Sequence, residues 1–240
     1  MKKLIIFIVF VAIASCIGYA IYYKSNEKYI VSSKKYEKLQ ETIKNDKSKN
    51  ENSKEKIPYD YNKFKKLNKN AYGYIRIKGT KIDYPVVKAD KDNNYYLNHD
   101  SSNSYNAYGS IYVDYRCDKN SLNTIIYGHH MNNGAMFGDL INFKSYDYYK
   151  SHQNIEIWEK EKKYNCKIIS CFEASPTDAK LYQTSFANKD SKEEWNKYIL
   201  SKKLYNTEVV NEKEIGETYL LSTCTNYNSN RFIVVLGKKK

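Results

Sequence analysis

Hydrophobic and polar positions divide the chain into three stretches with different patterns. Residues 4–23 are twenty consecutive positions without a charged side chain, about what a helix needs to cross the apolar core of a bilayer, roughly 30 Å thick. Residues 24–56 are mostly polar. From residue 57 on, short apolar runs alternate with turn-forming residues, which is typical of β-strands. We therefore predict a membrane anchor over 1–23, a juxtamembrane linker over 24–56 and one folded domain over 57–240.

Nine short runs in the domain have the alternating or continuously apolar pattern of strands, so the domain is expected to be mainly β, a barrel or a sandwich. Five stretches with helical spacing interrupt them, and Ser191 with Glu194 forms a Ser-x-x-Glu start for the last. The predicted strands are 72–77, 82–87, 109–113, 124–127, 154–158, 164–173, 207–210, 219–223 and 231–236. The predicted helices are 62–70, 91–97, 135–142, 146–151 and 191–201.

The apolar segment at the N-terminus admits three interpretations. Its full length and the interfacial tyrosines Tyr19, Tyr22 and Tyr23 favour an uncleaved anchor with the N-terminus inside. The sequence Ile-Ala-Ser-Cys16 resembles a lipoprotein processing box, which would make Cys16 a lipidated N-terminus. A cleaved secretory signal is the third interpretation, and it alone would release the domain from the membrane.

Positive charge is concentrated outside the predicted domain. Of the formal net charge of +13, the linker carries +4, Lys2 and Lys3 carry +2 and residues 238–240 carry +3, which leaves only +4 for residues 57–237. This distribution fits an anionic membrane or wall surface better than a nucleic-acid groove, and we expect no nucleic-acid partner. A solvated linker without any partner explains the linker charge equally well.

The linker has few apolar positions. Ile30, Val31, Tyr36, Leu39 and Ile43 leave room for one short amphipathic helix. The composition of residues 44–56 predicts a disordered or loosely helical stretch.

The candidate chemistry lies where apolar runs end. Cys224 ends one run and Arg231 begins the next, and a third run leads through Tyr-Gly into His129 and His130. A cysteine at a strand edge can act as a nucleophile when its neighbours favour the thiolate. Only three of the 40 basic residues are arginines, so Arg231 suggests a geometric need for a guanidinium that holds a carbonyl oxygen or an oxyanion. We therefore interpret Cys224, Arg231 and one of these two adjacent histidines as a candidate site.

The other thiols point to structural roles. Five cysteines are an odd number, which argues against a complete disulfide framework. Cys166 and Cys171 lie five positions apart on one predicted strand, on opposite faces and roughly 16 Å from each other, too far for a disulfide. None of the four histidines lies at the short spacing from a cysteine that a metal site uses. We expect no metal or other cofactor.

These motifs together resemble the sortases, and specifically class B. The resemblance covers about residues 57–237 and includes three supporting stretches in the family's order, 82–87, 92–100 and 109–116. One departure is visible, because the family often reads Thr-Leu-x-Thr-Cys and Leu220 occupies the first of these positions.

The resemblance implies a closed eight-stranded β-barrel with peripheral helices, preceded by an N-terminal transmembrane helix. It also implies a cysteine transpeptidase of a Gram-positive cell, in which the Cys224 thiolate attacks the threonine carbonyl of a C-terminal sorting signal of the Asn-Pro-x-Thr or Ser-Pro-x-Thr type. Protonated His129 would donate to the leaving amine, and Arg231 would hold the oxyanion. The acyl group would pass to an amine of a lipid-linked peptidoglycan precursor.

Further residue roles follow from the same resemblance. His130 is expected to face elsewhere as a neighbour of the catalytic imidazole. Residues that either contact the sorting signal or pack beneath the site are Asn93, Leu97, Tyr127, Ser222 and Thr223. The domain is expected on the outer face of the cell membrane, held by a single span.

Three alternatives remain open. A pilin-polymerising sortase would use a lysine side chain as the amine nucleophile, which the sequence does not distinguish from wall anchoring. A non-catalytic wall-binding module with this fold would explain anchor, linker and barrel but would not require Cys, His and Arg together. Papain-type and wall-hydrolase peptidases place Cys before His, the reverse of the order here.

Overall fold

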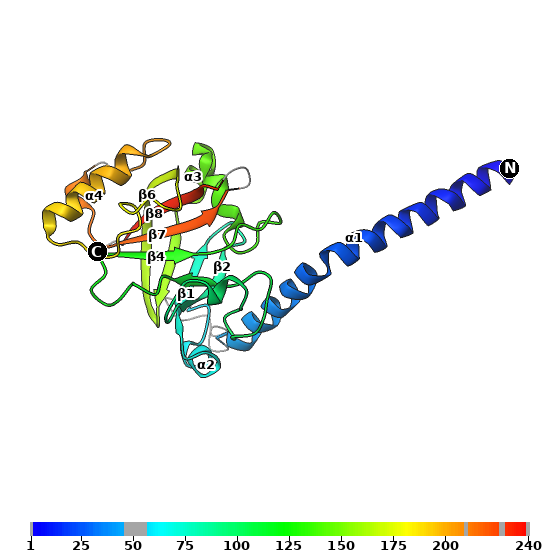
Figure 1. The fold of residues 1–240 in the computed structure, drawn as a ribbon, viewed down its shortest axis with the longest axis horizontal. Coiled ribbons are helices and arrows are strands. Elements are labelled where there is room, and N and C mark those ends of the chain that lie inside the picture. The colour runs from blue at the N-terminus through cyan, green and yellow to red at the C-terminus, as the bar shows by residue number, and fades with distance from the viewer. Residues whose placement is uncertain (1, 46–56, 209–210, 226–228, 239–240) are drawn as a thin grey trace, which may run out of the picture.

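Eight strands close into a barrel in the computed structural model of the protein, which describes residues 2–45, 57–208, 211–225 and 229–238 (Figure 1). Around the barrel the strand order is β1-β2-β3-β4-β7-β8-β6-β5. The pairs β2 with β3 and β4 with β7 are parallel, and the other neighbouring pairs are antiparallel. The predicted eight-stranded barrel with peripheral helices is confirmed.

The element bounds are as follows. The strands are β1 Ala71–Ile77, β2 Asp83–Lys88, β3 Ile111–Val113, β4 Asn123–Tyr127, β5 Ile155–Glu159, β6 Lys162–Ala174, β7 Thr218–Cys224 and β8 Arg231–Lys238. The α-helices are α1 Lys2–Ile43, α2 Tyr61–Leu67, α3 Tyr146–Ser151 and α4 Lys189–Ser201. The 3₁₀ helices are η2 Tyr95–Leu97, η3 Gly138–Lys144 and η4 Glu212–Glu214.

Two local predictions are wrong. Thr207 is not part of a strand, because its hydroxyl donates to the Ile169 carbonyl at 2.8 Å and the next amide donates to a tyrosine hydroxyl; residues 209–210 lie outside the described residues. The α4 N-cap is Asn188, whose side chain accepts from the Ser191 amide at 2.8 Å. Ser191 is therefore the third helical residue of a capping box and not its start.

Two of the predicted helices are shorter and tighter than expected. Within residues 91–97 only η2 is helical, and the stretch predicted over 135–142 forms η3. Met136 lies inside the stretch predicted over 135–142 and has a φ of +56°, a left-handed conformation that a right-handed helix cannot continue through.

The hydrophobic core has two parts. The larger part fills the barrel and extends under α4, where Trp195 and Ile199 are buried. The smaller part lies where α2 and the end of α1 cover β1, and it is mostly aromatic. Its buried members are Ile43, Tyr59, Phe64, Ala71, Tyr74, Val87, Ala89, Tyr96, Tyr112 and Trp158.

The N-terminal helix is one continuous rod that extends far beyond the barrel (Figure 1). It is the one described helix that is long and apolar enough to cross a membrane. The expected short helix of the linker is instead the last part of α1, because no Gly or Pro occurs between Gly18 and Pro58 to interrupt it. The predicted border at residue 23 thus falls inside α1, and residues 46–56 lie outside the described part.

The C-terminal third of α1 is docked on the barrel. Tyr36, Leu39 and Ile43 are buried, and the Tyr36 hydroxyl donates to the Gly109 carbonyl at 2.5 Å. The Gln40 amide donates to the Asp83 carbonyl at 2.6 Å. Because apolar burial and specific hydrogen bonds both hold this segment, the orientation of the rod relative to the barrel is fixed.

Lys192 on α4 has a buried side-chain amine, and among the described residues no carboxylate pairs with it. Its Nζ donates to Asn196 Oδ1 at 2.7 Å and lies 4.3 Å from the centroid of the Trp195 ring. Burial lowers the pKa of Lys192 to about 7.

We expect the lysine to make stability depend on pH. Between about pH 7 and 10.5 the unfolded state holds the lysine proton that the folded state has released, so stability rises with pH in that window. From pH 7 to 9, the wild type should gain about 2 kcal/mol more unfolding free energy than Lys192→Met, measured by urea unfolding in detergent micelles. The exposed Lys197→Met is the control and should follow the wild type; equal pH dependence in both variants would contradict the prediction.

Candidate functional site

The pairing of β4 with β7 brings together residues that lie far apart in the sequence. The two strands are parallel, with Tyr127 opposite Ser222, and the Gly128 amide donates to the Ser222 carbonyl at 3.3 Å. Parallel strands end at the same edge of a sheet, so His129 and Cys224 lie at one end of the barrel. In the antiparallel β7–β8 pair, Cys224 lies directly opposite Arg231. The three predicted catalytic residues therefore meet at one edge.

Gly128 is required by a close approach between the end of β4 and its neighbours. A Cβ atom at this position would lie 2.5 Å from Ile111 Cδ1 and 2.8 Å from the Phe137 ring. The chain can turn out of β4 into His129 only without a side chain here. After the turn, the Phe137 amide donates to the His129 carbonyl at 2.9 Å, which fixes the backbone that carries the imidazole.

The two adjacent histidines have different surroundings. His129 Nε2 lies 2.7 Å from the Leu97 carbonyl oxygen, and since a carbonyl only accepts, the imidazole is the donor. His130 Nδ1 is buried and has no hydrogen-bond partner among the described residues. Desolvation lowers the pKa of His130, which disfavours its cationic form.

Cys224 differs from the other thiols of the barrel by its exposure. It is partly exposed, whereas Cys117, Cys166 and Cys171 are buried, and none of the described cysteines forms a disulfide. Burial raises the pKa of Cys117 to about 11 and those of Cys166 and Cys171 to about 12. Because only a thiolate is a good nucleophile, these three thiols are inert at neutral pH.

Three tyrosines form a wall beside Cys224 and Arg231. The rings of Tyr112 and Tyr127 are 5.4 Å apart, and those of Tyr127 and Tyr182 are 6.3 Å apart. Burial raises the pKa of Tyr112 and of Tyr182, while the positive charge of Arg231 opposes the rise at both and negative charge on the Cys224 sulfur adds to it. Both hydroxyls therefore lie within electrostatic reach of the cysteine and the arginine.

A buried carboxylate organises the polar groups behind this wall. Asp114 is fully buried and accepts from the Arg116 guanidinium at 2.7 and 2.9 Å, from the Tyr127 hydroxyl at 3.0 Å and from Asn93 Nδ2 at 3.0 Å. Burial alone would raise the pKa of Asp114, but the hydrogen bonds and charge of Arg116 and the Tyr127 hydroxyl lower it below its usual value. Two of the predicted substrate contacts, Asn93 and Tyr127, are thus held by one anion.

The remaining predicted contacts are placed differently. Leu97 is 41% exposed and meets His129 through its backbone. Ser222 is buried, and its hydroxyl lies 3.1 Å from that of Tyr182. Thr223 is buried and follows Ser222 on the opposite face of β7, so its side chain points away from the face that carries Cys224. Thr223 could therefore contact a substrate only through its backbone atoms.

Sequence reasoning assigned no role to Asp114, Arg116 or Tyr182. Arg116 could have been noticed, because it is one of only three arginines and stands two positions after Asp114. Tyr182 has no such signal, since it lies in the connection between β6 and β7 and meets the site only through the fold. Within the described residues, no group of three His, Cys, Asp or Glu side chains could hold a metal ion.

Comparison with known proteins identifies the family. The model of the sortase domain matches residues 75–239. The chain belongs to the sortase family. Sortase B of Staphylococcus aureus is 31% identical over 223 residues, which cover 90% of this chain and 89% of that protein. Sortase B of Listeria monocytogenes is 34% identical over 176 residues, 70% of each chain.

The structural comparison agrees with class B. The structure of a Staphylococcus aureus sortase B–substrate complex superposes with a TM-score of 0.75 at 28% identity, covering 90% of this chain and 99% of that chain. The predicted membership in the class B sortases, which are cysteine transpeptidases, is confirmed.

The role of Asp114 in this sortase is testable by Asp114→Asn. The amide would present N–H groups to a ring of donors and leave Arg116 without its anion, so we expect a loss of about 2 to 3 kcal/mol in unfolding free energy at pH 7. The difference from the wild type should shrink below about pH 4, because a lowered carboxyl pKa contributes stability that is lost as the pH falls through it. Urea unfolding measures both, and the exposed Asp90→Asn is the control. A loss as small as that of the control would contradict the network.

The contrast among the thiols predicts selective alkylation. With iodoacetamide at pH 8, the buried cysteines of this sortase should react at least about 100-fold more slowly than a partly exposed thiol, because very little of each is thiolate. Peptide mass mapping of the native protein should therefore find label on Cys224 before Cys117, Cys166 or Cys171. In denaturant all four should react alike. Equal labelling in the native state would refute the assigned burial.

Proposed function

We propose that this sortase cleaves a C-terminal sorting signal of the Asn-Pro-x-Thr or Ser-Pro-x-Thr type after its threonine and transfers the surface protein to an amine of a peptidoglycan precursor. The observation that carries the proposal is the meeting of Cys224, His129 and Arg231 at one end of the barrel, through the β4–β7 and β7–β8 registers. A nucleophile, a proton donor and an oxyanion holder are the groups that acyl transfer needs.

In the first half-reaction the Cys224 thiolate attacks the threonine carbonyl carbon, and a C–S bond forms. The carbonyl oxygen becomes an oxyanion, which the Arg231 guanidinium stabilises with a fixed positive charge. Protonated His129 donates its proton to the amide nitrogen as the C–N bond breaks, so the amine leaves neutral. The products are a thioacyl enzyme and a neutral imidazole.

In the second half-reaction an incoming amine attacks the thioacyl carbon and gives its proton to His129. The C–S bond breaks and Cys224 leaves as a thiolate, which restores the thiolate and imidazolium pair. The Leu97 carbonyl, which accepts from His129 Nε2 at 2.7 Å, stabilises the imidazolium in both halves of the cycle.

The sorting signal is proposed to lie along Asn93, Leu97, Tyr127 and Ser222, with the backbone of Thr223. Asn93 and Tyr127 share the buried Asp114, so their side chains are held in place before substrate arrives. Among the relatives, one solved sortase B is a substrate complex and another is complexed with a glycine tripeptide, which supports a peptide signal and an amine acceptor for this chain.

The apolar part of α1 is proposed to span the cell membrane once, with the barrel on the outer side. Its 42-residue length and its exposed apolar side chains support this assignment. The acceptor amine would then be carried by a lipid-linked precursor in the same membrane, and no nucleic-acid partner is involved.

The proposal is tested with the full-length protein in detergent micelles and peptides of the Asn-Pro-x-Thr, Ser-Pro-x-Thr and Leu-Pro-x-Thr types. Intact mass should show an acyl adduct on Cys224 that is absent in Cys224→Ala. Arg231→Lys keeps the charge but loses the fork of donors, so turnover should fall about 100-fold.

Arg76→Lys is the matched control. Arg76 pairs with Asp83 at 2.9 Å on β1 and β2, so its replacement should change turnover by less than about twofold. A folded protein that forms no adduct with any peptide would overturn the transpeptidase assignment for these signals and favour a wall-binding module. Equal effects of the two Arg→Lys changes would remove Arg231 from the mechanism.

A further inference from the structure

A groove of about 880 Å³ lies between α1 and the loop that follows β4. We call it the α1 groove. Its floor and walls come from α1, from Ala107 and Tyr108, and from the loop His129–Asn133. The proposed sorting-signal residues do not line it, so within the described residues the groove meets the proposed active site only at His129. The lining residues from α1 are Tyr22, Asn26, Tyr29, Ile30, Ser33, Lys34 and Glu37.

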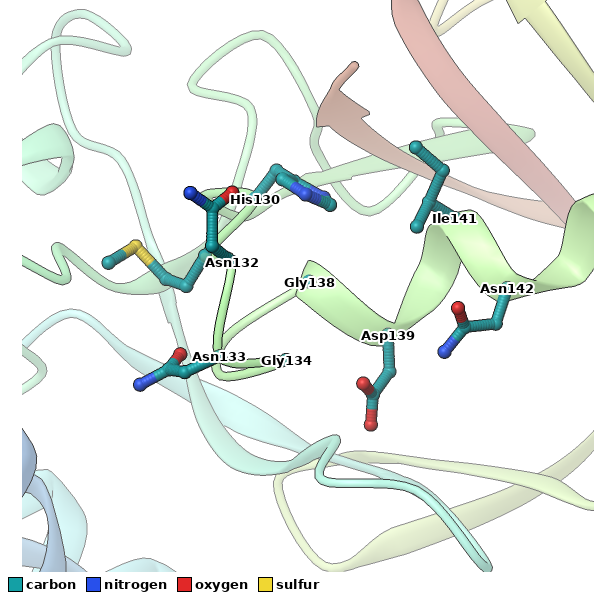
Figure 2. Close-up of a pocket in the computed structure, with 9 residues that line it drawn as sticks. His130, Asn132, Asn133, Gly134, Gly138, Asp139, Ile141 and Asn142 are labelled. Atoms are coloured by element: carbon teal, nitrogen blue, oxygen red, sulfur yellow. The ribbon is translucent and has the colours of Figure 1, made fainter. Parts of the chain in front are cut away.

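A second hollow of about 780 Å³ lies against the same loop (Figure 2). His130, Met131, Asn132 and Asn133 line both hollows, so the two hollows adjoin at this loop. In Figure 2 the second hollow is bordered by η3, from which Asp139 and Asn142 extend. It does not include His129, so of these two hollows the α1 groove is the one that reaches the imidazole.

The chemistry of the α1 groove fits a peptide that ends in an amine. Amide and hydroxyl side chains such as Asn26, Ser33 and Asn132 line it, and these groups donate to and accept from peptide bonds. Glu37 supplies a carboxylate for an ammonium group. Asn133 is held against the Tyr108 hydroxyl at 2.7 Å, which stiffens the wall opposite α1.

The second half of the proposed reaction requires an acceptor amine next to His129. His129 handles the leaving amine and must then take the proton of the incoming amine, so the acceptor has to reach the same imidazole. The face of His129 toward Leu97 belongs to the proposed sorting-signal side. The α1 groove is a separate approach to the ring.

The groove begins where the apolar part of α1 ends. Tyr22 lies at the end of the uncharged segment and Glu37 lies fifteen residues further along the same helix, which is about 22 Å at the helical rise. If α1 spans the membrane as proposed, one end of the groove lies at the membrane surface and the other lies above it.

We propose that the α1 groove is the acceptor site, which takes the amine-bearing peptide of a precursor held in the same membrane and leads it from the membrane surface to His129. This inference rests on the proposed function. When the amine attacks, the C–N bond forms, the C–S bond to Cys224 breaks and the amine proton passes to His129.

The test fills the groove with a bulky side chain. Ser33→Trp in full-length protein in lipid vesicles should form the Cys224 thioacyl within about twofold of the wild-type rate, when the signal peptide is short beyond the cleaved bond. Transfer to triglycine, or to a peptide with a free lysine side-chain amine, should fall at least about tenfold. Transfer to hydroxylamine, which is too small to need the groove, should not change.

The matched control is Val31→Trp, which places the same side chain two residues away at a position that is 44% exposed and does not line the groove. It should transfer to every amine like the wild type. Should Ser33→Trp fail to fold, Asn26→Trp fills the membrane end of the groove and carries the same expectation.

The outcomes separate the two proposals. Absence of the adduct on Cys224 overturns the proposed function. A normal adduct with peptide transfer that is unchanged in Ser33→Trp, or that falls equally in Val31→Trp, overturns the acceptor groove alone. A wild type that uses neither peptide amine better than hydroxylamine also overturns it, because the groove would then bind no peptide acceptor.

Discussion

The parallel pairing of β4 with β7 is the constraint on which the site depends. Ser222 follows Tyr127 by 95 positions in the chain, yet the two lie opposite each other in the register. A shift of one residue would turn every side chain of β7 to the other face and move Cys224 away from Arg231. The strands and helices between β4 and β7 therefore bring β7 back beside β4, parallel to it and in the correct register.

The hydrogen bonds around Asp114 fix the positions of polar side chains next to the β4–β7 pair. An anion that is fully buried must be hydrogen-bonded on all sides, and here Arg116, Tyr127 and Asn93 meet that demand. The cost of burying the charge is offset only when each donor keeps its position. The same requirement that stabilises the carboxylate thus holds two of the groups that face the proposed substrate.

Much of the fold and part of the site could be predicted from the sequence. The features that depend on neighbouring positions were predicted, and those that depend on long-range contacts were not. Apolar runs are local, so eight of the nine predicted strands exist. The docking of α1 was not foreseen, because the partner of Tyr36 is the Gly109 carbonyl, more than seventy residues away. Tyr182 and Asp114 were likewise missed as parts of the site, since what they do depends on contacts across the barrel and not on neighbouring positions.

The exposure of a single barrel thiol has a consequence for oxidative damage. A partly exposed thiol is open to oxidation to a sulfenic acid, which is normally rescued when a nearby thiol closes a disulfide. Within the described barrel the other three thiols are buried, so none is available to rescue Cys224. An oxidised Cys224 would depend on a reductant from outside the molecule, and without one it would proceed to the irreversible sulfinic and sulfonic acids.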